Sequence, residues 1–113
     1  MSIKEAQKLI SNPLINDLAK ASHWADLGAG NGVFTTALAQ LLPPQSTIQA
    51  VDQDARVLRR VPTFVQDVTI THHQADFQTI SFDQPLDGIL MANAIHYVEH
   101  KQNLVHRLKS FLK

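Results

Sequence analysis

Residues 26–32 read DLGAGNG, a loop of alternating glycines between two segments of different character. Before the loop, residues 24–27 form a short apolar run that is typical of a strand. After the loop, apolar residues within 34–41 recur at the spacing of one helical face. Because glycine has no Cβ, the backbone of such a loop can turn tightly and lie against a ligand. The stretch therefore predicts a strand–loop–helix unit with a binding site at its turn.

Strand and helix signals continue to alternate along the rest of the chain. Further strands are expected at residues 47–51, 68–73 and 86–91, and helices at 3–10, 13–20, 54–61 and 99–112. Strands that alternate with helices are typical of a parallel sheet with crossover helices. We therefore predict an α/β fold.

Composition limits the classes of function. The chain has 113 residues, which is enough for one domain, with ten Lys and Arg, ten Asp and Glu, and no cysteine. A formal charge of zero argues against a dedicated nucleic-acid binder, and the lack of cysteine excludes disulfides and thiolate metal sites. No apolar run could span a bilayer, and residues 1–10 contain no apolar signal core. We expect a soluble, cytoplasmic domain.

An acidic residue, Asp52, lies twenty residues after Gly32, at the end of the next predicted strand. The ends of neighbouring parallel strands lie side by side, so this carboxylate could accept both hydroxyls of a ribose bound at the loop. The alternative is that the glycines only make a turn and that Asp52 caps a helix. The order of strand, loop, helix, strand and acid favours a nucleoside-containing ligand.

Two positions near the loop help to distinguish the possible ligands. A dinucleotide fingerprint needs Gly or Ala at the sixth position counted from Gly28, and this chain has Val33 there. Asp26, two places before Gly28, would repel a pyrophosphate and attract a cation. S-adenosylmethionine (SAM) has no phosphate and carries a sulfonium and an ammonium. SAM is therefore favoured, and an NAD-dependent oxidoreductase remains the alternative.

Residues 26–32 resemble the first motif of class I, Rossmann-like SAM-dependent methyltransferases, and most resemble their small-molecule methyltransferase family. The resemblance runs from residue 24 to the end of the chain. It implies a doubly wound parallel sheet with the complete strand order 3-2-1-4-5-7-6. We expect this chain to supply strands 1 to 4 in the order 3-2-1-4, with N-terminal helices in residues 1–22. Residues 23–113 would form a SAM-binding half-domain that is truncated before strand 5.

The resemblance also implies roles for individual residues. The cofactor-binding residues would be Asp26, Gly28, Ala29, Gly30, Gly32, Asp52, Gln53, Asp76, Phe77 and Asn93. The acid before the loop and the loop itself would face the methionine part of SAM, Asp52 the ribose and Gln53 the adenine. Asp76 would accept a hydrogen bond from the adenine amino group, and the Phe77 N–H would meet a ring nitrogen. An ordinary polar turn is the alternative for this last pair. Asn93 would line the methyl-transfer site, or else cap a helix.

Methyl transfer from a sulfonium depends mainly on the orientation of two reactants, and only a poorly acidic nucleophile needs a general base. The nearest candidate base is His96, with Tyr97 lining the acceptor pocket; a surface histidine is the alternative. Residues 96–100 also match the H-x-x-E-H zinc-peptidase pattern. A catalytic zinc site needs a third protein ligand, and only residues 101–113 remain downstream of this match. The resemblance to methyltransferases also accounts for the segment, so we expect no metal site.

The neutral charge and the resemblance favour a small-molecule methyl acceptor, with no nucleic-acid or membrane partner. An RNA or protein methyltransferase and a non-catalytic SAM-binding module remain alternatives. The last predicted strand carries Ile89, Leu90 and Met91 and would be an open edge of the sheet. Open apolar edges invite pairing with other chains, so we expect self-association through this strand.

Overall fold

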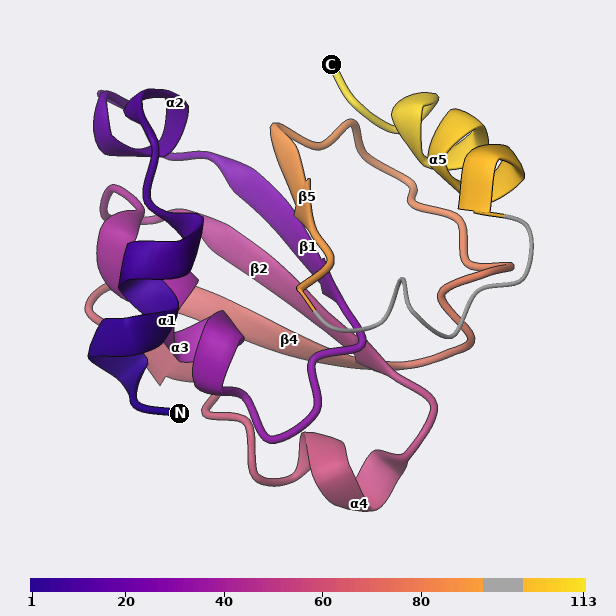
Figure 1. Ribbon diagram of the computed structural model, residues 1–113, viewed down its shortest axis with the longest axis horizontal. Helices are drawn as coiled ribbons and strands as arrows, with labels where there is room; N and C mark the ends of the chain where they lie inside the picture. Colours follow the sequence, from indigo (N-terminus) through magenta and orange to yellow (C-terminus); the bar gives the residue numbers. More distant parts are fainter. Residues whose placement is uncertain (93–100) are drawn as a thin grey trace.

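The computed structural model describes residues 1–92 and 101–113, which form a mixed five-stranded sheet flanked by helices (Figure 1). The strands are β1 (His23–Leu27), β2 (Thr47–Asp52), β3 (Phe64–Val65), β4 (Val68–Gln74) and β5 (Gly88–Leu90). The helices are α1 (Ile3–Ile10), α2 (Pro13–Asn16), α3 (Val33–Leu41), α4 (Ala55–Leu58) and α5 (Lys101–Lys109). The strand order is β3-β4-β2-β1-β5, and every neighbouring pair is parallel except β3 with β4.

The parallel strands confirm the predicted α/β fold. In chain order, β1, β2, β4 and β5 are the four predicted strands, and they lie in the predicted order 3-2-1-4. The structure adds β3, which the sequence did not predict and which pairs antiparallel with β4. Its turn uses Gln66 and Asp67 at φ 46° and 65°. Two-residue hairpin turns with positive φ are normally recognised in a sequence by glycine or asparagine, and neither residue is present in this turn.

Several elements are shorter than predicted. The helix expected at residues 13–20 ends at Asn16, and the one expected at 54–61 spans only Ala55–Leu58. After α4 the backbone forms a 3₁₀-type turn, in which the Val61 N–H donates to the Leu58 carbonyl oxygen. Pro62 follows directly after this turn. The predicted strand 86–91 is reduced to Gly88–Leu90. Residues 99 and 100 of the last predicted helix lie outside the described residues.

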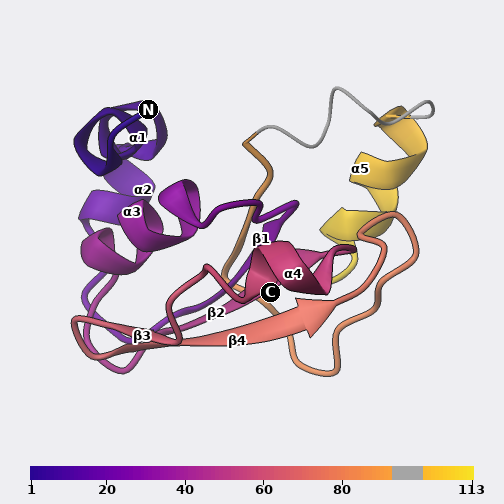
Figure 2. The ribbon, with the colours of Figure 1, turned by 90° about the horizontal axis from the view of Figure 1, so that it is seen from below.

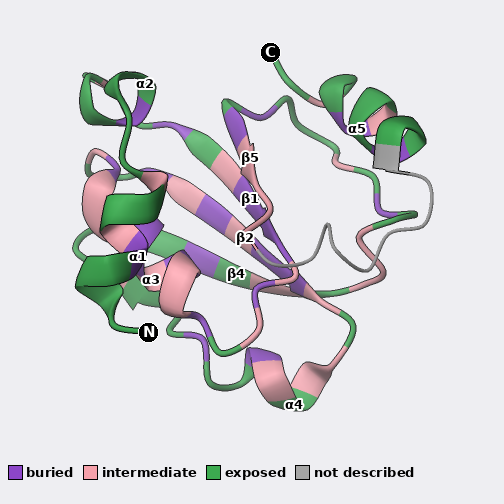
Figure 3. Ribbon diagram, viewed as in Figure 1, coloured by how far each residue is buried: buried purple, intermediate pink, exposed green. Residues whose placement is uncertain are grey.

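The sheet buries apolar side chains on both faces, and Figure 3 shows the buried residues concentrated along its central strands. On one face, Ile48 of β2 packs in a cluster with Leu38 of α3. On the other face, Val51 of β2 packs with Leu104 of α5. Helix α5 accordingly lies apart from α1, α2 and α3 (Figure 2). Successive buried residues, Ala25 to Leu27 in β1 and Ala50 with Val51 in β2, agree with burial on both faces, whereas β4 begins with alternating buried and exposed residues.

Helix α1 packs on α3. The side chain of Ser2 caps α1 by accepting a hydrogen bond from the Glu5 N–H at 3.1 Å, and a serine three residues before a glutamate is the sequence pattern of a capping box. Ala6 is buried, and the Gln7 amide donates to the Gln40 side chain at 2.6 Å. The division of the chain at residue 22 stays a prediction. None of the helices within residues 1–92 and 101–113 has the length and apolar character needed to cross a bilayer.

The last residues of the chain begin to pair beside β5. The Leu86 N–H donates to the Phe111 carbonyl oxygen at 2.8 Å, and the Lys113 N–H donates to the Leu86 carbonyl oxygen at 2.9 Å. Leu86 and Leu112 thus form an isolated parallel bridge. No described segment pairs with the same edge of β5 at Gly88–Leu90.

The contact between Trp24 and Gly88 leads to a stability prediction. A Cβ on Gly88 would lie 2.3 Å from the Trp24 ring, so an alanine would force the strand or the indole to move. We expect Gly88→Ala to lower the free energy of unfolding by about 1–3 kcal/mol, measured by urea denaturation. Combined with Trp24→Leu, which removes the obstacle, the total loss should be at least about 0.5 kcal/mol smaller than the sum of the two single losses. Additive losses would contradict this account.

Candidate functional site

The glycine loop turns sharply at the carboxyl end of β1. The N–H groups of Gly28 and Ala29 both donate to the carbonyl oxygen of Val51, at 2.8 and 2.9 Å. Gly28, Gly30 and Gly32 have φ values of 73°, 58° and 86°, in the left-handed region that other residues rarely adopt. The loop is therefore pinned to the end of β2, next to the residue predicted to bind ribose.

Two of the glycines are needed for different reasons. A Cβ on Gly32 would lie 3.1 Å from Val61, so this glycine allows α3 to begin against the segment after α4. Among the described residues, a Cβ on Gly30 would meet no heavy atom nearer than 3.9 Å. With respect to those residues, the backbone at Gly30 is therefore open on that side, next to the start of a nine-residue helix. Open backbone of this kind allows a ligand to approach closely.

Asp52 at the end of β2 is half-buried and bonded directly to the loop. Its Oδ2 accepts a hydrogen bond from the Gly30 N–H at 3.1 Å, and its Oδ1 accepts one from the Asp54 N–H at 3.0 Å. The structure thus brings Asp52 and the glycine loop together. Each carboxylate oxygen can accept a further hydrogen bond, so these contacts leave acceptor capacity for ribose hydroxyls.

Asp26 lies beneath the loop rather than on its surface. The residue is 1% exposed, and its Oδ2 accepts a 2.5 Å hydrogen bond from the Thr35 hydroxyl on α3. The pKa of Asp26 is raised to about 6, mainly because burial disfavours the charged form; the hydrogen bond from Thr35 acts in the opposite direction, and the negative charge of Asp52 acts in the same direction as burial. The carboxylate ties β1 to α3, and its predicted role toward the methionine part of SAM stays a prediction.

Thr35 is a residue of this site that the sequence analysis missed. It is fully buried and lies three residues before Leu38, on the same apolar face of α3. A hydroxyl on the buried face of a helix needs a polar partner, because an unsatisfied buried donor is costly. That rule, applied to the predicted helix, could have indicated a polar group on the facing strand.

Asp76 lies two residues after the end of β4, whose last residue, Gln74, pairs with Asp52. The Ala75 N–H donates to the Asp52 carbonyl oxygen at 3.0 Å, which continues the pairing of β4 with β2. The Asp76 Oδ1 accepts a hydrogen bond from the Gln78 N–H at 2.9 Å, so the polar turn that was the alternative interpretation is present. Phe77 is half-buried against the apolar cluster beneath α5. The adenine contacts predicted for Asp76 and Phe77 stay predictions.

Of the remaining predicted residues, Gln53 is the one that lies within the described part of the chain. Gln53 is exposed, and its carbonyl oxygen accepts a hydrogen bond from the Gln74 amide at 3.2 Å. Asn93 and His96 lie outside the described residues, as do Tyr97 and the rest of the H-x-x-E-H match. Within residues 1–92 and 101–113, no group of three or more His, Asp or Glu side chains could hold a metal ion.

An apolar groove of about 690 Å³ runs beside β5. Its lining includes Met1, Leu9, Trp24, Phe34, Leu90 and Ala92. Asp87 also lines the groove, and its carboxylate is engaged by the Lys113 ammonium at 3.0 Å and the His23 N–H at 2.7 Å. Partial burial raises the pKa of Asp87, but these partners outweigh burial and the net shift is downward. Since Phe34 follows the glycine loop, one end of the groove lies close to the candidate cofactor site.

The family comparison matches this geometry. A family model described as a methyltransferase domain matches residues 25–113, and the chain belongs to that family. Uncharacterized methyltransferases of Mycobacterium tuberculosis and Mycobacterium bovis are each 32% identical over 84 residues. These alignments cover 74% of this chain and 41% of each relative, so the chain spans about two fifths of the relatives' length.

Solved structures share the fold. The plantazolicin methyltransferase BpumL, in complex with S-adenosylhomocysteine (SAH), matches 96% of this chain and 41% of its own, with a TM-score of 0.74 and 16% identity. The YcgJ protein from Bacillus subtilis matches 97% of this chain and 47% of its own, with a TM-score of 0.72 and 19% identity. At these identities the likeness shows a common Rossmann-like architecture.

Buried Asp26 leads to a prediction about pH. Its pKa is raised from 3.8 to about 6 in the folded state, so the folded protein holds this proton more tightly than the unfolded chain. Asp26 should therefore make the free energy of unfolding fall as the pH rises from about 4 to about 6, by at most about 3 kcal/mol. Urea unfolding at a series of pH values measures this slope.

The matched control for this experiment is an exposed carboxylate. We expect Asp26→Asn to remove this contribution to the pH slope, whereas Asp83→Asn, at an exposed position, keeps it. Equal pH slopes in wild type and Asp26→Asn would show that Asp26 titrates as it does in the unfolded chain.

Proposed function

We propose that this chain carries the cofactor-binding part of a SAM-dependent methyltransferase. The observation that carries the proposal is the hydrogen bond from the Gly30 N–H to the Asp52 carboxylate, which joins the loop backbone to the side chain that would accept the ribose hydroxyls. The charges near the loop suit SAM, because the carboxylates of Asp26 and Asp52 favour a cationic ligand over a phosphate. Membership of the methyltransferase domain family supports the same conclusion.

When bound, SAM supplies a methyl group on a sulfonium that is already activated for transfer. The residues of this chain would bind and orient it, which is the main requirement of such a reaction. Asp52 would hold the ribose hydroxyls, and Asp76 would accept a hydrogen bond from the adenine amino group. Because its pKa is about 6, Asp26 is mostly ionised at pH 7, and its buried charge would favour the cationic methionine part.

We also propose that the methyl acceptor is a small molecule of apolar character. The groove beside β5 supports this proposal by its volume of about 690 Å³, which is in the usual range for small-molecule sites. Its acidic lining residue, Asp87, is neutralised by Lys113. Asn93 would line the transfer site and His96 would serve as general base where the acceptor needs one. The cytoplasmic location also stays a prediction, which cell fractionation would test.

Self-association through β5 is the third part of the proposal. The Asp87 N–H donates to the His23 carbonyl oxygen of β1 at 2.7 Å. Since backbone groups of successive strand residues point to alternate sides, Gly88 and Leu90 direct theirs away from β1, toward the open edge. Unpaired N–H and C=O groups on an edge form a template for another strand.

The cofactor proposal predicts that the chain binds SAH and not NADH in calorimetric titrations. Asp52→Ala should weaken SAH binding by about 1–3 kcal/mol, because ribose hydrogen bonds to a charged acceptor are lost. Asp83→Ala removes one exposed carboxylate away from the loop and should leave the affinity unchanged. Binding of NADH alone would overturn the proposal in favour of an oxidoreductase, and unchanged SAH affinity in Asp52→Ala would remove Asp52 from the site.

The edge proposal predicts a molecular mass that rises above the monomer value with concentration, measured by static light scattering. Leu90→Pro removes the outward N–H donor of β5, so it should shift association to higher concentration. Circular dichroism would check that this variant keeps its fold. A constant monomer mass of the wild type up to millimolar concentration would contradict edge pairing.

A further inference from the structure

Arg107 of α5 holds the turn that follows β4. Its guanidinium donates to the carbonyl oxygens of Gln78 at 3.4 Å, Thr79 at 2.8 Å, and Ile80. A planar fork of N–H donors can serve several acceptors at once, which a lysine ammonium cannot do with the same geometry. In the described part of the chain no carboxylate forms an ion pair with Arg107, and the hydrogen bonds that its guanidinium donates there all go to this turn.

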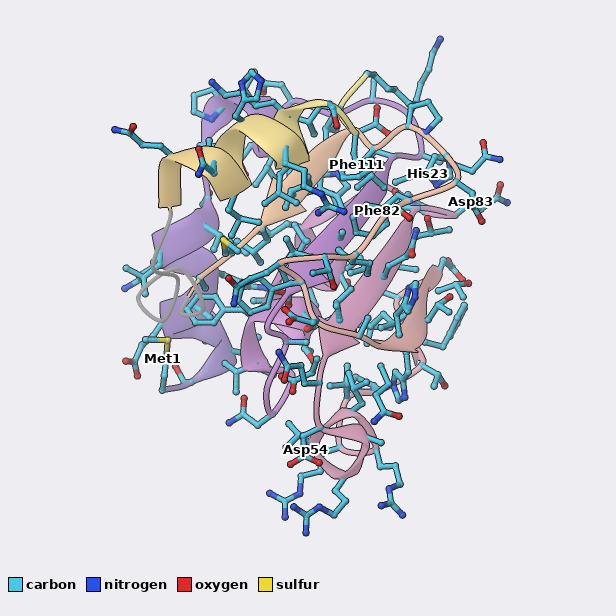
Figure 4. The ribbon with its side chains drawn as sticks, turned by 90° about the vertical axis from the view of Figure 1, so that its right-hand side faces the viewer. Met1, His23, Asp54, Phe82, Asp83 and Phe111 are labelled. Carbon is cyan, nitrogen blue, oxygen red and sulfur yellow. The ribbon has the colours of Figure 1, made fainter. Side chains whose placement is uncertain are left out.

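An aromatic pair sets the position of the guanidinium. The Arg107 Cζ lies 5.4 Å from the centroid of the Phe111 ring, within the range of a cation–π contact. Phe111 packs edge-on against Phe82, with ring centroids 5.2 Å apart and planes at 83°. Figure 4 shows the two rings close together beside α5. Arg107 is thus half-buried at a defined place and is not a freely moving surface cation.

The turn held by Arg107 is the one that carries Asp76. The N–H groups of Thr79 and Ile80 donate to the Asp76 carbonyl oxygen at 3.1 and 3.0 Å. The carbonyl oxygens of the same two residues accept from Arg107. Asp76 therefore binds the N–H groups of this turn, and Arg107 binds its carbonyl oxygens. A shift of the turn would move the Asp76 carboxylate, whose Oδ1 is bonded to the Gln78 N–H within it.

We infer that Arg107 is a positioning residue for recognition of the adenine amino group. It acts through the Asp76–Ile80 turn and touches no cofactor atom itself. The inference rests on the proposed function, because it assumes that Asp76 accepts a hydrogen bond from the adenine. It gives α5, which packs on the face of the sheet opposite α3, a role in selecting the nucleoside base.

The test compares SAH with S-inosylhomocysteine, in which a carbonyl replaces the adenine amino group. Arg107→Met keeps an apolar stem over Phe111 and removes the three hydrogen bonds. Lys109→Met, the matched control, removes the same charge from an exposed position of the same helix. We expect Arg107→Met to weaken SAH binding by about 3–10-fold and S-inosylhomocysteine binding by less than about twofold, with Lys109→Met changing neither. Equal weakening of both ligands, or unchanged SAH affinity, would overturn the inference.

Amide hydrogen exchange of the ligand-free protein separates this inference from the cofactor proposal. Arg107→Met should speed exchange at Thr79 and Ile80 by about tenfold, for a loss near 1.4 kcal/mol in local stability, and leave β1 and β2 unchanged. Unchanged exchange at both amides would overturn the positioning role whatever the ligand data show. If the wild type binds no SAH, the cofactor proposal fails and the adenine role fails with it, whereas the exchange data still decide whether Arg107 holds the turn.

Discussion

The hydrogen bond between the Gly30 N–H and the Asp52 carboxylate joins the two strand ends on which the candidate site depends. A glycine-rich loop has many conformations in the unfolded chain, and selecting one of them carries an entropic cost. Here residues of β2 fix the conformation of the loop, because the Val51 carbonyl oxygen accepts its first two N–H groups and the Asp52 carboxylate accepts the next one. The residue that shapes the loop is thus also the one that we propose as the acceptor of the ribose hydroxyls.

The buried carboxylate of Asp26 carries a cost in stability beside its proposed role toward a cationic cofactor. Removing a carboxylate from water is unfavourable, and the hydroxyl of Thr35 offsets only part of that cost, since the pKa of Asp26 remains raised to about 6. The same burial strengthens the electrostatic effect of the charge on a nearby cation, because the surroundings screen it less than water does. Strongly perturbed carboxylates of this kind are typical of binding and catalytic sites.

Apolar periodicity and glycine or proline boundaries were sufficient to predict the central strands, whereas the expected strand order came from the family resemblance. The strands expected at 24–27, 47–51 and 68–73 each lie within one residue of the observed bounds, and parallel topology correctly placed Asp52 beside the loop. The depth of Asp26 could not be predicted, because it depends on how α3 packs across β1. The hydrogen bond from Arg107 to the Ile80 carbonyl oxygen joins residues 27 positions apart. Local sequence patterns do not contain information on contacts of that range, so this bond could not be predicted.

The two outer edges of the described sheet differ in what they allow. On one side, β3 consists of only two residues and turns back on β4, which blunts that edge in the way natural sheets limit unwanted pairing. On the other side, β5 ends the sheet with outward-facing backbone groups, and one parallel bridge at Leu86 is already formed. A further strand would therefore find a row of unpaired backbone groups next to β5, whereas the edge at β3 offers only two residues for pairing.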